Sequence, residues 1–144
     1  MNEVVGAVLT RPSIDAARAA AILDEHWGLR GTLRPLPSER DRNFAVAVDG
    51  ADRFVLKVSN ATEDAPNLDL QHRAMDRLAA AGIPCQLPVP DRDGREVIDA
   101  GNATTPALAR VLTWLPGRPL ATIAPADRTP ALIADHWNGR WAAG

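Results

Sequence analysis

Two short segments with alternating apolar side chains flank a turn that contains glycine. Residues 43–48 and residues 53–58 each carry a large apolar side chain at every second position, so that these side chains share one side. The turn between the two segments holds Gly50. Alternation with a period of two is typical of strands that are buried on one face. A short glycine-containing turn joins such strands as a hairpin. The chain is therefore predicted to contain an antiparallel sheet.

A helix is expected before this hairpin and another after it. The first begins near Pro12, with Ser13 as its N-cap, and ends at Gly28 or Gly31. Its apolar side is expected to hold Ile14, Ala17, Ala21, Leu23 and Trp27. The second helix covers residues 66–81 and has helical periodicity at Leu68, Met75, Leu78 and Ala79.

The remaining elements complete an α+β fold. Further strands are predicted over 32–36, 89–91, 96–99 and 107–113, with 89–91 and 96–99 forming a second hairpin, and a last helix begins near Pro125 or Pro130. The fold that we expect is a five-stranded antiparallel sheet, one strand fewer than these ranges, with a helix between strands 3 and 4, flanked by N- and C-terminal helices. Strands in hairpins argue against a doubly wound parallel sheet.

Composition narrows the classes of partner. The 144 residues suit one domain, and a net charge of −2 gives no electrostatic case for nucleic acid or an anionic membrane. No apolar run approaches the roughly 20 residues needed to span a bilayer. Cys85 is the single cysteine. It excludes an internal disulfide, has no companion at metal-ligand spacing and fits a cytoplasmic protein.

Three segments add polar or charged residues to the predicted strands. The loop 36–44 reads Leu-Pro-Ser-Glu-Arg-Asp-Arg-Asn-Phe, and such a loop can direct N–H groups and a hydroxyl towards phosphate oxygens. Lys57 interrupts an apolar strand, on the face opposite Leu56. The segment 110–120 runs from an apolar strand into Trp-Leu-Pro-Gly. Taken singly, these also fit a solvated loop, a surface lysine and a buried strand with its exit turn.

Together, in this order, the segments resemble the N-terminal lobe of the aminoglycoside phosphotransferase and choline kinase-like family, over roughly residues 13–134. The closest resemblance is to the kinase-like domain at the N-terminus of class III aminotransferase fusions. The resemblance implies an ATP-dependent small-molecule phosphotransferase. It also implies that the loop covers the nucleotide phosphates through Ser38, Arg40, Asn43 and Phe44.

The same resemblance assigns the other nucleotide contacts. Lys57 would hold the α- and β-phosphates, and Gln71 stands where protein kinases carry the glutamate that pairs with this lysine. A glutamine can accept a hydrogen bond from Lys57 but supplies no charge. Leu112 matches the gatekeeper, the Thr113 carbonyl would accept from the adenine amine, and the Leu115 N–H would donate to a ring nitrogen.

The resemblance leaves out the chemistry. The family places its catalytic aspartate and magnesium ligands in a C-terminal lobe, in a His-Gly-Asp…Asn loop and a later aspartate. None of His26, His72 and His136 is followed by Gly-Asp. We therefore expect a truncated chain that is inactive alone, without catalytic or metal-binding residues of its own, and with Mg²⁺ bound only together with the missing lobe. His72 is expected on a solvated helix surface.

These expectations divide the chain into a tail (1–12), a kinase-like N-lobe (13–120), and a hinge exit with the start of the missing C-lobe (121–144). One alternative is a non-catalytic protein-interaction module derived from a kinase lobe, since an uncovered lobe exposes an apolar face to a C-lobe or another protein. Its candidate anchors are Trp114, Trp137 and Trp141. Another alternative is an unrelated α+β fold.

Overall fold

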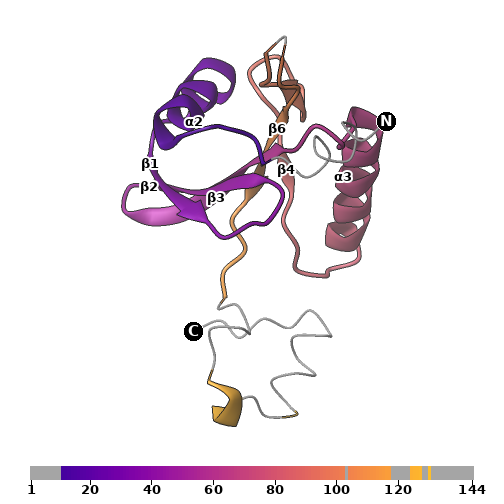
Figure 1. Cartoon of the computed structure of the whole chain (residues 1–144). Helices are drawn as coiled ribbons and strands as arrows, with labels where there is room; N and C mark the ends of the chain where they lie inside the picture. Colours follow the sequence, from indigo (N-terminus) through magenta and orange to yellow (C-terminus); the bar gives the residue numbers. More distant parts are fainter. Residues whose placement is uncertain (1–10, 103, 118–123, 128–129, 131–144) are drawn as a thin grey trace, which may run out of the picture.

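The computed structural model describes residues 11–102, 104–117, 124–127 and 130. Its elements are α2 (Ala16–Ile22), the π-helix η1 (Leu23–Trp27), β1 (Thr32–Leu36), β2 (Arg42–Val48), β3 (Ala51–Ser59), α3 (Ala65–Ala80), β4 (Pro88–Val89), β5 (Ile98–Asp99), β6 (Leu108–Thr113) and the 3₁₀ turn η3 (Pro125–Asp127). The strands form one six-stranded sheet in the order β1-β2-β3-β6-β4, with β5 paired to β6 (Figure 1). All pairings are antiparallel, so the predicted α+β fold is confirmed.

The hairpin predicted from the alternating segments is β2 and β3. Phe44 lies opposite Leu56, and the register shifts at Val46/Ala47. The connecting turn holds Asp49 at φ 53° and Gly50 at φ 79°. Both residues occupy the left-handed region, which asparagine-like residues and glycine tolerate best. This turn therefore sets the register of the central strands.

The second predicted hairpin is wrong in its pairing. Pro88 of β4 lies opposite Leu112, and Ile98 of β5 lies opposite Ala109, so both short strands pair with β6 and not with each other. The turn between them is real, because Asp91 Oδ1 accepts from the backbone N–H groups of Asp93 and Arg95. Two short pieces thus share one edge of β6, and the sheet has six strands, as many as the predicted ranges and one more than the expected five.

The first helix begins two residues later than predicted. Asp15, not Ser13, is the N-cap, and its Oδ1 accepts from the Arg18 N–H at 2.8 Å. The predicted end at Gly28 is confirmed, since Gly28 caps η1 with φ 65°. This left-handed conformation suits glycine, which lacks a Cβ.

The buried stripe of this helix also differs from the prediction. Ala19, Ile22 and Leu23 are fully buried, whereas Ala17 and Ala21 are exposed. The larger apolar side chains set the phase of the helix, because they remove the most apolar area from water. The buried core joins this stripe to one face of the sheet through Ile14, Trp27, Phe44, Val46, Leu56, Val58, Ile98, Ala107, Ala109 and Val111.

Helix α3 lies on a different side of the strands from α2 (Figure 1). Asp64 caps its start by accepting from the Asn67 N–H at 2.8 Å. The residues that α3 buries are Leu68 and His72, one turn apart. The expectation of a solvated His72 is wrong, since His72 is 0% exposed. Leu78, which was expected on the apolar side, is 41% exposed.

Some predictions fall outside the described residues. These are the anchors Trp137 and Trp141, the tail up to residue 10, and His136. The predicted last helix is represented by η3 and by the helical residue Pro130. Of the helices in the described ranges, none has the length and apolar character that crossing a bilayer requires.

Candidate functional site

The middle of the sheet carries a row of three polar side chains. Asn43 on β2 lies opposite Lys57 on β3, and Lys57 lies opposite Arg110 on β6. Strand alternation places this row on the face turned away from the core, because the neighbours Leu56 and Val111 belong to the core. Lys57 is the chain's only lysine, and the rest of its 16 basic residues are arginines. Lys57 thus lies on the face of the sheet opposite to that of Leu56, as the alternation in the sequence predicted.

Lys57 is half-buried among charged neighbours. Burial lowers the pKa of Lys57 from its ordinary 10.5, and the neighbouring charge of Arg110 lowers this pKa further. Asp41 and Glu63 act in the opposite direction, with smaller effects. No carboxylate of the described residues forms an ion pair with Lys57. The ammonium group therefore stands in a setting that favours an added anion.

Gln71 has a different partner from the one expected. Its Oε1 accepts a hydrogen bond from Nη2 of Arg110 at 2.9 Å. Helix α3 thus holds the β6 arginine, where a protein kinase would hold the β3 lysine. Residue Arg110 is only 5% exposed, and burial lowers the pKa of its guanidinium, against smaller opposite effects of Glu63 and Asp41.

Three buried polar atoms in this row have no hydrogen-bond partner among the described residues. They are Nε and Nη1 of Arg110 and Oδ1 of Asn43. Buried polar atoms without a partner are uncommon, because each loses its hydrogen bonds to water. Two of these three atoms are cationic donors. The row therefore has the donor set and charge that fit a phosphate group.

The loop before β2 is closed by its own hydrogen bonds. Ser38 Oγ accepts from the Asp41 N–H at 3.2 Å, so this hydroxyl is already engaged with the loop. The Asp41 carboxylate in turn accepts from both the backbone N–H and the side-chain amide of Asn60, each at 3.1 Å. Arg40 is exposed at the loop tip. The loop is thereby fixed to the chain segment that follows β3.

Phe44 does not share the face of Lys57. Its side chain is 1% exposed and packs in the core, on the α2 side of the sheet. The guanidinium of Arg42 lies 5.7 Å from the centre of the Phe44 ring. Because adjacent strand residues point to opposite faces, Asn43 reaches the row and Phe44 cannot. Phe44 is thus a core residue of the hairpin and makes no contact with this face.

The exit of β6 holds the residues expected to contact adenine. Leu112 is 1% exposed and lies opposite Val55, on the same face as Lys57. The Thr113 carbonyl already accepts from Nε2 of Gln86 at 3.2 Å, so an adenine amine would use its second lone pair. Leu115 follows in an irregular segment and is half-buried.

Two residues at or near this candidate site were absent from the predictions. Arg110 was not assigned, although it interrupts an apolar strand just as Lys57 does. Pairing strand 107–113 with strand 53–58 would have placed it beside Lys57. Gln86 was also absent, and its contact with Thr113 spans 27 residues of sequence, for which the sequence holds no local signal.

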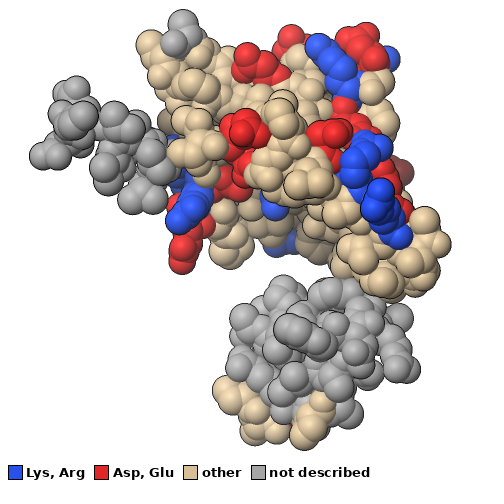
Figure 2. All heavy atoms as spheres, turned by 90° about the vertical axis from the view of Figure 1, so that its right-hand side faces the viewer, with Lys and Arg blue, Asp and Glu red and all other residues tan. Residues whose placement is uncertain are grey.

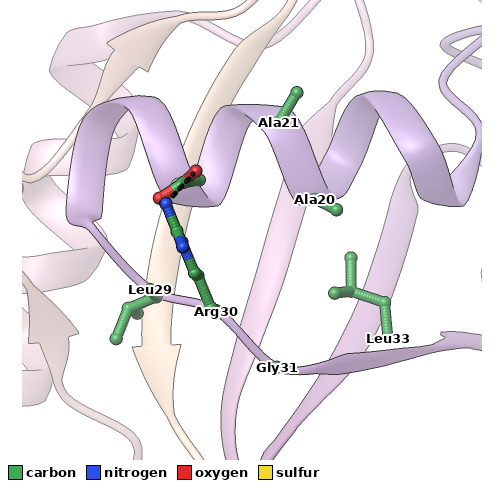
Figure 3. Close-up of a pocket in the computed structure, with 7 residues that line it drawn as sticks. Ala20, Ala21, Leu29, Arg30, Gly31 and Leu33 are labelled. Atoms are coloured by element: carbon green, nitrogen blue, oxygen red, sulfur yellow. Dashed lines mark hydrogen bonds and ion pairs between the residues drawn. The ribbon is translucent and has the colours of Figure 1, made fainter.

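A shallow hollow lies on the other face of the sheet. Figure 3 shows it between α2 and β1, where the Arg30–Asp24 ion pair at 3.1 Å forms part of its wall. Its volume is about 290 Å³ and its remaining lining is Ala20, Ala21, Leu29, Gly31 and Leu33. Leu33 pairs with the core residue Val46, so the hollow lies on the face opposite to Lys57. It is therefore separate from the polar row.

The charges on the α3 side are mixed in sign. Figure 2 shows acidic and basic side chains interspersed over this side of the molecule. Part of this pattern is a group around Arg73, which contacts Asp69, Asp76 and Glu96. Within the described ranges, no group of three or more His, Cys, Asp or Glu side chains is arranged to hold a metal ion.

Comparison with known proteins gives one family and one fold. The family model described as "Phosphotransferase enzyme family" matches residues 32–137. Hydroxylysine kinase of Danio rerio is 34% identical over 133 residues, which are 88% of this chain and 37% of that protein. Hydroxylysine kinase of Bos taurus is 36% identical over 130 residues, which are 80% of this chain and 34% of that protein. The chain thus spans about a third of the length of these curated relatives.

A solved structure agrees in fold. The amicoumacin kinase hAmiN, solved in complex with AMP-PNP, Ca²⁺ and Ami, superposes with a TM-score of 0.60 at 19% identity. The match covers 88% of this chain and 36% of the kinase. The family match extends from β1 beyond the exit of β6 and includes every residue of the polar row. This chain therefore belongs to the phosphotransferase enzyme family and has its kinase-like fold.

Proposed function

We propose that this chain is the nucleotide-binding lobe of an ATP-dependent small-molecule phosphotransferase. The observation that carries the proposal is the setting of the only lysine. In a chain that otherwise uses arginine, Lys57 lies half-buried between Asn43 and Arg110 and forms no ion pair within the part of the chain that the structure describes. A compact ammonium on a flexible stem can follow the α- and β-phosphates as they move during phosphoryl transfer, which a rigid guanidinium does less well.

The rest of the site is assigned along the same face. The loop that contains Ser38 and Arg40 would lie over the phosphates with its backbone N–H groups. Adenine would bind next to the Lys57 row, where the buried side chains of Leu112 and its cross-strand partner Val55 would border the site. The Thr113 carbonyl and the Leu115 N–H would provide its polar contacts.

The comparisons support the general class of this assignment, a kinase that binds a nucleotide. The curated relatives are named as kinases, and the structural neighbour was solved with AMP-PNP. We propose that the phosphate acceptor, the catalytic base and the Mg²⁺ ligands belong to the part of such kinases that this chain does not match. The chain alone is then expected to bind ATP weakly and to transfer no phosphate.

The test is calorimetry of ATP with the 144-residue chain, with and without Mg²⁺. Lys57→Ala should abolish the binding, because it removes the ammonium from the phosphates. Arg53→Ala, at an exposed position on the same strand, is the matched control and should bind as the parent does. A folded chain that binds no ATP, or a Lys57→Ala variant that binds it equally well, would refute the proposal.

A protein-interaction module is the competing function. Leu70, Leu78 and Ile83 lie on or just after α3 and are 68%, 41% and 41% exposed. Exposed apolar groups on one element favour a covering partner. A folded chain that does not bind ATP would favour this hypothesis over the nucleotide-binding lobe.

A further inference from the structure

We infer that Arg110 is a second anion-binding side chain of this site, which binds the phosphate chain together with Lys57 while Gln71 positions its guanidinium. The inference rests on the proposed function and adds to it a residue and a ligand requirement. An anion that reaches both cations would match them best with two or more negative charges, as the phosphate chain of a nucleotide or a polyphosphate does.

The register brings the two cations together. Lys57 and Arg110 are direct partners on the adjacent strands β3 and β6, and both side chains lie on the same face. Strands in a sheet are roughly 4.8 Å apart, so one phosphate chain can reach both side chains. The charge of Arg110 lowers the pKa of Lys57, and an anion bound between the two cations would offset this repulsion.

The hydrogen bonds of Arg110 leave most of its donors free. Nη2 donates to Gln71 Oε1 at 2.9 Å, while Nε and Nη1 have no partner among the described residues. This guanidinium belongs to a residue that is 5% exposed, so water replaces few of the absent partners. A planar guanidinium presents a fork that matches two phosphate oxygens. Bound phosphate would therefore satisfy donors that the folded chain leaves unsatisfied.

The surrounding acidic residues do not neutralise the pair. Asp41 and Glu63 influence both cations but form no ion pair with them among the described contacts. The Asp41 carboxylate accepts from Asn60, and the Glu63 carboxylate accepts from the Asn67 amide. Both carboxylates are thus held elsewhere, and the positive charge remains available to a ligand.

Glutamine at position 71 fits this role better than glutamate. Its carbonyl oxygen orients Arg110 through one hydrogen bond without cancelling the charge. A carboxylate at this position would form an ion pair with Arg110 and compete with phosphate for its donors. Gln71 is therefore a positioning residue. Because it is neutral, it leaves the charges of Lys57 and Arg110 available to a bound anion.

The experiment measures binding of ATP and of inorganic tripolyphosphate to the 144-residue chain in chloride buffer. Arg110→Met should lower the affinity for both anions by about tenfold or more, because methionine has a similar length but no charged fork. Arg77→Gln removes one exposed charge from α3 and serves as the control, with unchanged affinities expected. A folded Arg110→Met that binds both anions like the parent overturns the inference.

Two further readouts separate anion binding from a purely structural role. Without anions, the midpoint of thermal unfolding of Arg110→Met should equal or exceed that of the parent, because the variant removes the repulsion between Arg110 and Lys57 and two buried donors that have no partner among the described residues. Added tripolyphosphate should then raise this midpoint in the parent and much less in the variant. If Arg110→Met does not fold, the binding of both anions to Gln71→Glu tests the inference in its place. This substitution should lower the affinity for both anions severalfold, and unchanged or tighter binding refutes the inference.

Failure of the inference and failure of the proposed function give different results. ATP binding that depends on Lys57 but not on Arg110 refutes the inference and leaves the nucleotide lobe in place. Tripolyphosphate binding that depends on Arg110, in a chain that does not bind ATP, refutes the nucleotide proposal and keeps the anion site. A folded chain that binds neither anion refutes both.

Discussion

Nδ1 of His72 lies 3.1 Å from Oε2 of Glu96, so helix α3 is joined to the segment before β5 by a buried histidine. The pair connects residues 24 positions apart in the sequence. Nε2 of His72 has no hydrogen-bond partner among the described residues. The ring is thus held at one nitrogen only and is shielded from solvent.

This setting predicts a loss of stability in weak acid. Burial first, and then the charge of Arg110, lower the pKa of His72 from its ordinary 6.5, although Glu96 opposes the change. Below pH 6.5 the unfolded chain binds a proton that the folded chain resists, so the free energy of unfolding falls until the folded pKa is passed. Urea unfolding at stepwise pH from 7.5 downwards measures this slope.

The matched variants for this prediction are His72→Gln and His26→Gln. His72→Gln removes the titrating ring and should flatten the slope, whereas His26→Gln should retain it. Equal slopes for His72→Gln and the parent would show that other groups cause the acid sensitivity.

The only lysine permits a direct measurement of its ionisation. Reductive methylation with ¹³C labels the ε-amine of Lys57 and otherwise only the α-amino group. The NMR titration midpoint of Lys57 should lie below that of the same group in the unfolded chain, because burial and Arg110 lower its pKa. Arg110→Met should move the midpoint upwards, and so should bound tripolyphosphate. A midpoint that ignores both changes would contradict the described proximity.

Trp27 predicts a stability contact between η1 and the outer edge of the sheet. Its Nε1 donates to the Val89 carbonyl at 2.8 Å, and the residue is 8% exposed. Trp27→Phe should lower the free energy of unfolding by about 1–3 kcal/mol, since it removes this hydrogen bond and part of a buried ring. Chemical denaturation measures the change, and Trp114→Phe at a half-buried position is the control. Equal losses for the two variants would argue against this hydrogen bond.

Leu112 offers a test of where adenine binds. Its side chain is 1% exposed and lies beside Val55 on the face of Lys57. Leu112→Phe would fill the space assigned to the base, at a cost in stability of about 1–3 kcal/mol. It should weaken ATP binding and leave tripolyphosphate binding unchanged, because only ATP carries the base. A parallel loss for the two anions would place the base elsewhere.

Local signals were enough to predict the centre of the sheet. Alternation and the turn at Gly50 predict the β2–β3 hairpin, and strand 32–36 has the bounds of β1. The face of Lys57 follows from the same period of two. Gly28 marks the end of the first helix because it has the left-handed conformation of a helix C-cap.

The remaining features depend on contacts that are distant in sequence. Strands β4 and β5 have two residues each, too few for any periodicity, and they exist through pairing with β6. The Arg110–Gln71 hydrogen bond spans 39 residues, so the partner of Gln71 could not be read from the helix alone. His72 was predicted to be solvated because a polar residue on a helix is usually exposed, and here tertiary packing overrides that tendency.

The double hydrogen bond from Asn60 to Asp41 has a consequence for how a ligand would enter. It ties the loop before β2 to the chain that leaves β3, at one end of the strand pair that carries Asn43 and Lys57. The loop and the strands therefore behave as one preassembled frame. A phosphate chain that enters this frame orders little additional backbone, so the entropic penalty of binding falls on the ligand and a few side chains.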